Sequence, residues 1–274
     1  MTTMQPLICV GGYDKQRLAA TKAAGFNKVE LSFAALAAMS QSEREDYLGT
    51  LDELGLTPVA ANGFFGQGLG GFFEDCFDLG KMREYIARAF EVTSAVRWES
   101  LAFGSGYMRR VPEGYPMEKA YDFMARFLTD EVVPMLEKYD TYLNIEELQT
   151  VETNFVNSCR DAAKLVEAIH HPRVGILCDF YHMSLAGETA ADVPDFGKYI
   201  RHVHIASPTN NRAVPVADDG DNAAYEAFFA ALAEADYPSG YISVEGGLPE
   251  GCDAADRIQR TYAYLQGALA PYQA

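Results

Sequence analysis

The sequence predicts a single (β/α)8 barrel, or TIM barrel, spanning residues 1–274. Short apolar runs alternate with segments of helical composition along the whole chain, and there are eight such pairs. Eight βα units in about 270 residues is the number that a closed barrel requires. Although 274 residues would also allow two domains, no linker or shift in composition divides the chain.

The individual elements follow in order along the chain. The apolar runs predict strands at Leu7–Val10, Lys28–Leu31, Thr57–Ala61, Trp98–Phe103, Tyr142–Glu146, Val174–Asp179, His202–Ala206 and Tyr241–Glu245. The intervening segments predict helices at Lys15–Ala24, Gln41–Leu54, Leu79–Ser94, Met117–Tyr139, Phe155–Ile169, Asp192–Tyr199, Ala223–Ala235 and Asp253–Ala268. Gly25 and Gly55 follow two of these helices, where a left-handed residue commonly ends a helix.

An open doubly wound sheet also alternates strands and helices, but its phosphate-binding signals are missing. The first strand is followed by GGYDK, which lacks the GxGxxG spacing, and the sequence contains no GxxxxGK[ST]. The glycine-rich stretch Gly63–Gly71 carries no lysine for a phosphate, so we interpret it as a mobile loop over the barrel mouth. FGSG, residues 103–106, is a second glycine turn. Both would open on the C-terminal face, where barrel active sites lie.

Composition argues against several classes of protein. The chain has 22 Lys and Arg against 39 Asp and Glu, a net charge of −17, which opposes binding to nucleic acid or to an anionic membrane surface. Its five cysteines are scattered and form no CxxC pair, as expected in a reducing compartment. We find neither a signal peptide nor an apolar segment long enough to span a bilayer, and therefore expect a cytoplasmic protein with no membrane partner.

Four consecutive predicted strands each bring one polar side chain to the same rim. These are Glu146, Asp179, His204 and Glu245. Taken singly, each has an ordinary explanation as a helix cap, a turn residue or a core histidine. Together, three carboxylates would repel one another unless a cation lies between them. Oxygen ligands with one imidazole suit a divalent metal, Mn²⁺ first and Mg²⁺ or Co²⁺ as alternatives.

Strand geometry distinguishes these residues from their neighbours. Adjacent strand residues face opposite sides, so only one of Glu146 and Glu147 can point inward, and we assign Glu146. His202 and His204 share a face, and we select His204 as the ligand because it lies nearer the C-terminal end of the strand.

Several segments carry a resemblance to a known family. They are GFNKVELSF (25–33), ANGFF (61–65), FGSGYMRRVPEGY (103–115), LNIEELQTVETNF (143–155), CDFYHM (178–183), HVHIASPTNNR (202–212) and ISVEGG (242–247). In order and spacing the chain resembles the xylose isomerase-like barrel superfamily of sugar isomerases and epimerases, especially its ketose 3-epimerase and hydroxypyruvate isomerase-like branches. The resemblance covers most of the chain.

The resemblance implies roles for individual residues. The metal would be held by Glu146, Asp179, His204 and Glu245, and the two glutamates would also move the proton. Sugar oxygens would be bound by Glu152, His182 and Arg212. Removing a proton beside a carbonyl needs Lewis-acid stabilisation of the enediolate, and two carboxylates on opposite faces can take and return it. Four aromatic side chains would either cover the apolar face of the sugar or pack in the core, and they are Phe64, Phe65, Phe103 and Tyr107. Of these we select Phe103 as a substrate contact.

Three features depart from the family pattern. Glu147 stands where these epimerases usually have proline, and it could contact substrate, act as a base or face the helices. Arg212 follows His204 by 8 residues, a slightly longer spacing than in many epimerases. Gly246 and Gly247 would leave that side of the mouth unusually open.

The leading hypothesis is a divalent-metal-dependent ketose epimerase or aldose–ketose isomerase whose partner is a small-molecule sugar. The alternative is a lyase that cleaves 3-oxo-glycosides, including C-glycosides, by β-elimination together with a smaller subunit. Endonuclease IV-like DNA repair needs a histidine-rich zinc site, whereas this chain has five histidines and a strong negative charge. A non-catalytic sugar-binding barrel is a further alternative. We expect a homo-oligomer, either a dimer or a tetramer.

Overall fold

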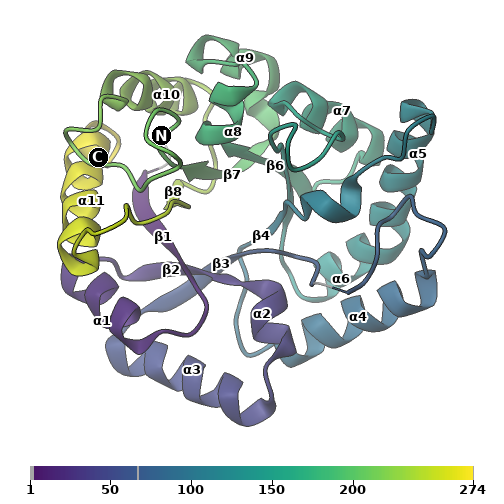
Figure 1. The fold of residues 1–274 in the computed structure, drawn as a ribbon, viewed down its shortest axis with the longest axis horizontal. Coiled ribbons are helices and arrows are strands. Elements are labelled where there is room, and N and C mark those ends of the chain that lie inside the picture. Colours follow the sequence, from purple (N-terminus) through teal and green to yellow (C-terminus); the bar gives the residue numbers. More distant parts are fainter. Residues whose placement is uncertain (1–2, 67, 274) are drawn as a thin grey trace.

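Eight parallel strands close into a barrel in the computed structural model, which describes residues 3–66 and 68–273. Each strand pairs with the next one in sequence, and β8 pairs with β1 to complete the ring (Figure 1). The predicted fold class is therefore confirmed. Gln67, within the glycine-rich stretch interpreted as a mobile loop, lies outside the described residues.

The strands are β1 (Gln5–Gly11), β2 (Lys28–Ser32), β3 (Thr57–Asn62), β4 (Ser100–Phe103), β5 (Leu143–Glu146), β6 (Val174–Asp179), β7 (Ile200–Ile205) and β8 (Tyr241–Val244). The α-helices are α1 (Lys15–Ala24), α2 (Phe33–Ala38), α3 (Gln41–Leu54), α4 (Leu79–Val92), α5 (Met117–Phe127), α6 (Val133–Lys138), α7 (Cys159–Ile169), α8 (Phe180–Leu185), α9 (Val193–Phe196), α10 (Asn222–Glu234) and α11 (Ala254–Leu269). Shorter 3-10 turns are η1 (Gly106–Arg109), η3 (Ala190–Asp192), η4 (Gly197–Tyr199) and η5 (Ala270–Tyr272), and η2 (Leu128–Val132) is a π-helical segment.

Helices α1 and α3 begin and end where the sequence predicts, whereas α7 begins at Cys159 and not at the predicted Phe155, because Ser158 caps it. The N-cap of α1 is Asp14, whose side chain accepts from two backbone amides, and Gly25 ends the helix in the left-handed conformation. The predicted helix Met117–Tyr139 is wrong as one element, because η2 interrupts it between α5 and α6. The predicted helix Asp192–Tyr199 is also wrong as one element, because α9 and two 3-10 turns share its span.

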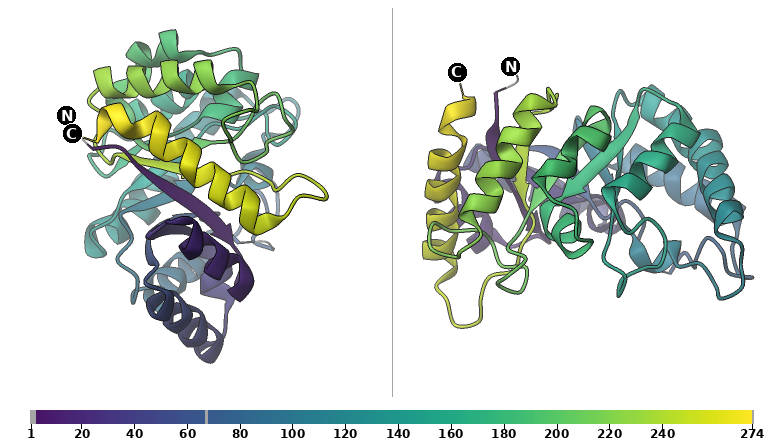
Figure 2. Two further views of the ribbon diagram at one scale, coloured as in Figure 1. Left: turned by 90° about the vertical axis from the view of Figure 1, so that its left-hand side faces the viewer. Right: turned by 90° about the horizontal axis from the view of Figure 1, so that it is seen from above.

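The helices surround the barrel, and the main core lies between them and the strands (Figure 1). The ends of the described chain meet where the Met4 amide donates to the Tyr272 carbonyl at 2.9 Å. Both views in Figure 2 place the two ends side by side. The α11 helix packs along α1 and β1, so the last βα unit seals against the first.

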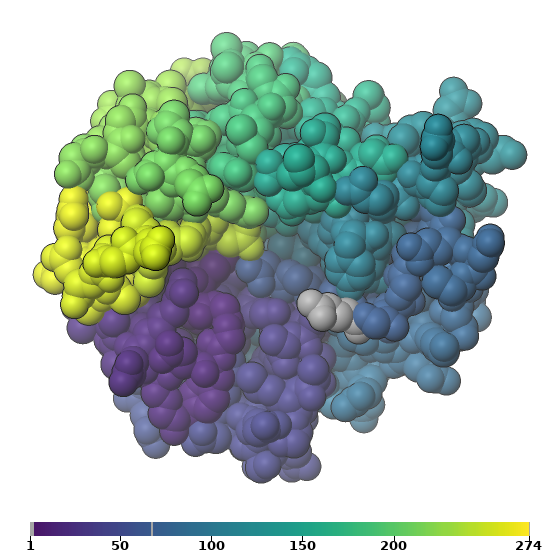
Figure 3. All heavy atoms as spheres, viewed as in Figure 1, coloured from purple at the N-terminus to yellow at the C-terminus, as the bar shows by residue number. Residues whose placement is uncertain are grey.

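Polar side chains lie at both ends of the barrel, because near the strand starts the Tyr241 hydroxyl is bonded to Lys28 and Glu99. Leu7, Val59 and Tyr241 form a small apolar cluster near the strand starts. Because alternate residues share a face, each strand then places its next inward residue one layer higher. Chain segments far apart in sequence converge around the centre of the C-terminal face, as their colours show in Figure 3.

Candidate metal centre and active site

The four predicted ligands converge at the C-terminal end of the barrel. Glu146, Asp179, His204 and Glu245 each offer one ligand atom, and these atoms all lie within 4.8 Å of one another. Asp179 and His204 are fully buried, whereas the Glu245 side chain is about a quarter exposed at 23%. The barrel thus brings together residues that are up to 99 positions apart in the sequence.

The ring of His204 has a defined orientation. Its Nε2 lies 2.9 Å from Oε1 of Glu30, a buried β2 residue that the sequence analysis did not identify. Its Nδ1 faces the other way, 3.4 Å from Oε1 of Glu146 and 3.4 Å from Oε2 of Glu245. Among the described residues, this Nδ1 is a buried polar atom without a hydrogen-bond partner. Nδ1 is therefore the nitrogen available to a metal.

Glu146 sits at the end of β5 in a tight environment. Burial raises the pKa of its carboxyl, and the nearby charges of Glu245 and Asp179 act in the same direction. A side chain at Gly104 would place its Cβ 2.3 Å from Oε2 of Glu146, so only glycine leaves room for this carboxylate. The buried guanidinium of Arg109 donates from Nη2 to the Glu146 carbonyl at 2.9 Å. Together these contacts fix where the carboxylate lies.

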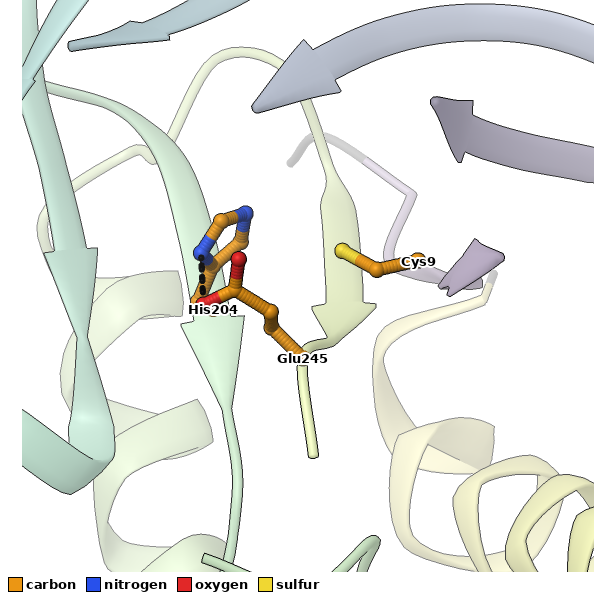
Figure 4. A group of neighbouring side chains, drawn as sticks. All are labelled: Cys9, His204 and Glu245. Carbon is orange, nitrogen blue, oxygen red and sulfur yellow. Dashed lines mark ion pairs between the residues drawn. The ribbon is translucent and has the colours of Figure 1, made fainter. Parts of the chain in front are cut away.

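Glu245 follows β8 and is held from two sides. Asn62, at the end of β3, donates from Nδ2 to Oε1 at 2.7 Å, and Arg212 donates from Nη2 to Oε2 at 2.5 Å. Burial would raise the pKa of Glu245, but the positive charges of His204 and Arg212 outweigh it and lower the pKa to about 2. Figure 4 shows Glu245 and His204 meeting, with the sulfur of Cys9 pointing toward the same space.

Asp179 ends β6 and starts α8. Its Oδ1 accepts from the Tyr181 amide at 2.8 Å, an N-cap bond that explains why the strand runs directly into a helix. Its Oδ2 accepts from Arg212 Nη2 at 3.1 Å. Its own amide donates to Oε1 of Glu147 at 2.9 Å.

That last bond assigns Glu147 to the outer side of the barrel. Glu147 is fully buried close to Cys159 at the start of α7 and Cys178 on β6. Burial raises the pKa of Glu147 well above its usual value, and the nearby Cys178 and Asp179 add to the shift. Glu147 could have contacted substrate, acted as a base or faced the helices, and in the structure its side chain faces the helices.

The three residues expected to bind sugar oxygens lie together beside the four ligands. His182 accepts from the Gln149 amide through Nδ1 at 3.2 Å, so its proton sits on Nε2. That Nε2 lies 3.7 Å from Asp179 Oδ2 and 3.8 Å from Glu152 Oε1. Arg212 Nη1 also lies 3.8 Å from Glu152 Oε1.

Phe103 and the glycine pair differ from the expectations. Phe103 is fully buried against Phe65, Phe72 and the guanidinium of Arg109, so it packs in the core here, and a sugar would reach it only if this cluster opened.

Gly246 and Gly247 do not leave the mouth open. A Cβ at Gly246 would come within 2.7 Å of the Val214 amide nitrogen, and the Gly247 amide donates to the Arg212 carbonyl at 2.8 Å. These glycines let the chain pack against the Arg212 segment.

The residues present fit a hard divalent cation. Three carboxylates supply oxygen ligands, and the orphaned Nδ1 of His204 supplies one nitrogen. Arg212 offsets only part of this negative charge, through Asp179 and Glu245.

Comparison with known proteins places the chain in a family. The family model described as xylose isomerase-like TIM barrel matches residues 18–266, and the chain belongs to this family. A 3-dehydro-D-guloside 4-epimerase of Escherichia coli is 26% identical over 231 residues, covering 81% of this chain and 84% of that protein. A probable ketose 3-epimerase of Synechocystis is 27% identical over 160 residues, covering 57% of this chain and 54%, about half, of that protein.

The fold also matches solved structures. The crystal structure of 3-keto-D-glucoside 4-epimerase from E. coli aligns with a TM-score of 0.75 at 20% identity, covering 97% of this chain and 100% of that one. Across residues 3–66 and 68–273, none of the helices combines the length and the apolar character needed to cross a bilayer.

Proposed function

We propose that this protein is a divalent-metal-dependent sugar epimerase of the isomerase class, which inverts a carbon next to a carbonyl group. The observation that carries the proposal is the convergence of Glu146, Asp179, His204 and Glu245, with the unpartnered Nδ1 of His204 facing two of the carboxylates. The names of the two relatives, a probable ketose 3-epimerase and a 3-dehydro-D-guloside 4-epimerase, support the same class.

The four convergent side chains would hold the metal, Mn²⁺ in the first place and Mg²⁺ or Co²⁺ as alternatives. When bound, the cation would supply Lewis-acid stabilisation of the negative charge that develops on the substrate as its proton leaves.

The protein's own groups account for the remaining steps. Glu146 on β5 and Glu245 after β8 reach the site from different sides of the barrel, so one can take the proton from one face of the sugar and the other can return it to the opposite face. Return to the opposite face inverts the carbon. One hydrogen bond from Asn62 holds the Glu245 carboxylate, and the absence of a side chain at Gly104 leaves room for that of Glu146.

We infer that His182, Arg212 and Glu152 orient the substrate. Nε2 of His182 carries a proton, is buried and has no hydrogen-bond partner among the described residues, so it can donate to a sugar oxygen. Arg212 supplies a cationic donor and Glu152 an acceptor on the same side.

The test is solvent exchange. The metal-loaded enzyme is incubated in D₂O with a panel of ketoses and 3-keto-glycosides, and the products are examined by NMR. We expect deuterium at the inverted carbon, and we expect Glu146→Gln and Glu245→Gln to lower the exchange rate by about 100-fold or more. Asn144→Ala, which changes a buried residue of β5 that bonds Ser100, is the control and should keep the exchange.

Two results would overturn the proposal. One is Mn²⁺ binding without exchange in any sugar of the panel. The other is release of the aglycone from a 3-oxo-glycoside without exchange in any ketose, which would favour the lyase.

A further inference from the structure

A second polar layer lies directly beneath the proposed metal ligands. It consists of Glu30 on β2, His202 on β7 and Ser243 on β8, all fully buried. Two strands, β1 and β8, separate β2 from β7 in the ring, so the Glu30 side chain reaches its partners across the barrel interior. Neither the proposed proton transfer nor the proposed sugar contacts use these residues.

Glu30 is the centre of this layer. Its Oε1 lies 2.9 Å from Nε2 of His204, and its Oε2 lies 2.9 Å from Nε2 of His202. Ser243 donates from Oγ to the same Oε2 at 2.7 Å. Both carboxylate oxygens are thus occupied by groups that can donate, as a buried carboxylate requires.

This arrangement determines which nitrogen of His204 can bind a metal. An ionised carboxylate only accepts hydrogen bonds, so the nitrogen facing Glu30 must carry a proton. The remaining nitrogen, Nδ1, is the one that faces Glu146 and Glu245. A hydrogen bond from the outer nitrogen of a metal-binding histidine to a carboxylate orients the ring and strengthens the nitrogen as a ligand.

We propose that Glu30 is a positioning residue for the metal centre, which holds the His204 ring so that Nδ1 points at the cation. The inference rests on the proposed metal site. His202 and Ser243 support it by anchoring the second oxygen of Glu30, so the carboxylate cannot rotate away from His204.

The experiment compares Mn²⁺ binding by the wild type, Glu30→Gln and Asn144→Ala, using electron paramagnetic resonance of free Mn²⁺ and thermal unfolding of each protein without metal. Glu30→Gln keeps the shape of the side chain but offers one acceptor oxygen where three donors meet. We expect its dissociation constant for Mn²⁺ to rise by about 10- to 100-fold. Asn144→Ala also disturbs a buried hydrogen bond on the barrel strands, to Ser100, but among the described residues Asn144 has no hydrogen bond to any of the four ligands, and the variant should bind Mn²⁺ like the wild type.

A folded Glu30→Gln protein that binds Mn²⁺ as tightly as the wild type would overturn the inference and leave the metal site standing. A wild type that does not bind Mn²⁺ would overturn the metal site itself and this inference with it. Because Glu30→Gln could fail to fold, a second measurement uses the wild type alone. In ¹⁵N-histidine NMR of the Mg²⁺-loaded protein, His204 should be protonated at Nε2 and unprotonated at Nδ1, and the reverse pattern would contradict the positioning role.

Discussion

Arg212 shows how one residue can serve two partners in this site. Its Nη2 contacts Asp179 and Glu245, half of the proposed ligand set, while its guanidinium also stacks over the ring of Tyr181 at 5.1 Å. The pKa of Arg212 is raised because the pull of Asp179 and Glu245 exceeds the effect of burial. Its backbone is left-handed, with φ of 55°, a conformation that costs free energy for a residue with a side chain. The contacts with Asp179, Glu245 and Tyr181 therefore hold the Arg212 guanidinium at the barrel mouth.

We expect Arg212→Ala to impair sugar binding rather than metal binding. Losing a charged hydrogen bond to the sugar should raise KM by about 10- to 100-fold. Removal of a competing cation should leave Mn²⁺ affinity no weaker than in the wild type. Steady-state kinetics and a Mn²⁺ titration measure the two effects separately. An unchanged KM combined with weaker Mn²⁺ binding would contradict this assignment.

Glu147 supports Asp179 from outside the barrel, and its two possible replacements should differ. Glu147→Gln keeps an acceptor for the Asp179 amide, so the free energy of unfolding should stay within about 0.5 kcal/mol of the wild type. Glu147→Ala leaves that buried amide unpaired and should cost about 1–3 kcal/mol. Urea unfolding measures both. A large loss of exchange activity in a stable Glu147→Gln protein would instead indicate a role in the chemistry.

At the scale of elements, the strand ends and the turns that follow them determine the site. β4 ends in Phe103, and the next residue, Gly104, leaves room for the Glu146 carboxylate. β8 leads into Gly246, which allows the chain to approach the Arg212 segment closely. These turns need glycine because of the side chains and backbone opposite them.

Gly104→Ala should move the Glu146 carboxylate without unfolding the barrel. The added Cβ would lie 2.3 Å from Oε2, so the carboxylate must shift. We expect Mn²⁺ binding to weaken at least about fivefold, in line with the usual cost of overpacking. Gly12→Ala is the matched control, because its Cβ would have no atom within 4 Å among the described residues. Equal Mn²⁺ affinity in the two variants would show that Gly104 does not constrain Glu146.

Elements that carry their own local signals were predictable from the sequence. α1 and α3 have an N-cap side chain at one end and a left-handed glycine at the other, and their bounds match the prediction. α2 and α8 were missed because each begins on the last residues of a strand, Ser32 and Asp179, and these act as caps. The long predicted helix was wrong as one element because the π segment η2 lies within it.

In the site too, residues with a local sequence signal were predictable and residues without one were not. The convergence of the four proposed ligands was predictable because each is a polar residue at a strand end or directly after it. Asn62, at the end of β3, satisfies that rule and was overlooked. Glu30 lies inside its strand, where only an acidic residue within an apolar run, KVELS, could have indicated it. Its partners His202 and Ser243 are more than 170 residues away, so their meeting depends on barrel closure.

At the scale of the whole molecule, closure of the barrel concentrates negative charge at one end. Of the 39 acidic residues in a chain of net charge −17, three turn inward at the mouth and a fourth lies just below them. Burying so many carboxylates together is costly without cations. The positive charges of Arg212, the two histidines and a bound metal would together offset the negative charge of these carboxylates.

Several large apolar side chains are exposed near the C-terminal end of the barrel, where another copy of the chain could cover them. Tyr107, Met117 and Val151 are exposed to 49%, 41% and 74%. We propose a homo-oligomer, a dimer or a tetramer, in which contact with another copy covers such residues. Light scattering coupled to size-exclusion chromatography should give a multiple of the chain mass of 30.1 kDa. A particle of a single chain mass at micromolar concentration would contradict this proposal.

Anomalous diffraction from crystals grown with Mn²⁺, recorded at the manganese absorption edge, would locate the proposed metal between its four ligands. We expect one strong peak within bonding distance of Glu146, Asp179, Glu245 and Nδ1 of His204, with Nε2 of that ring still bonded to Glu30. A mouth without a peak, or a peak bonded to the other nitrogen of His204, would contradict this expectation.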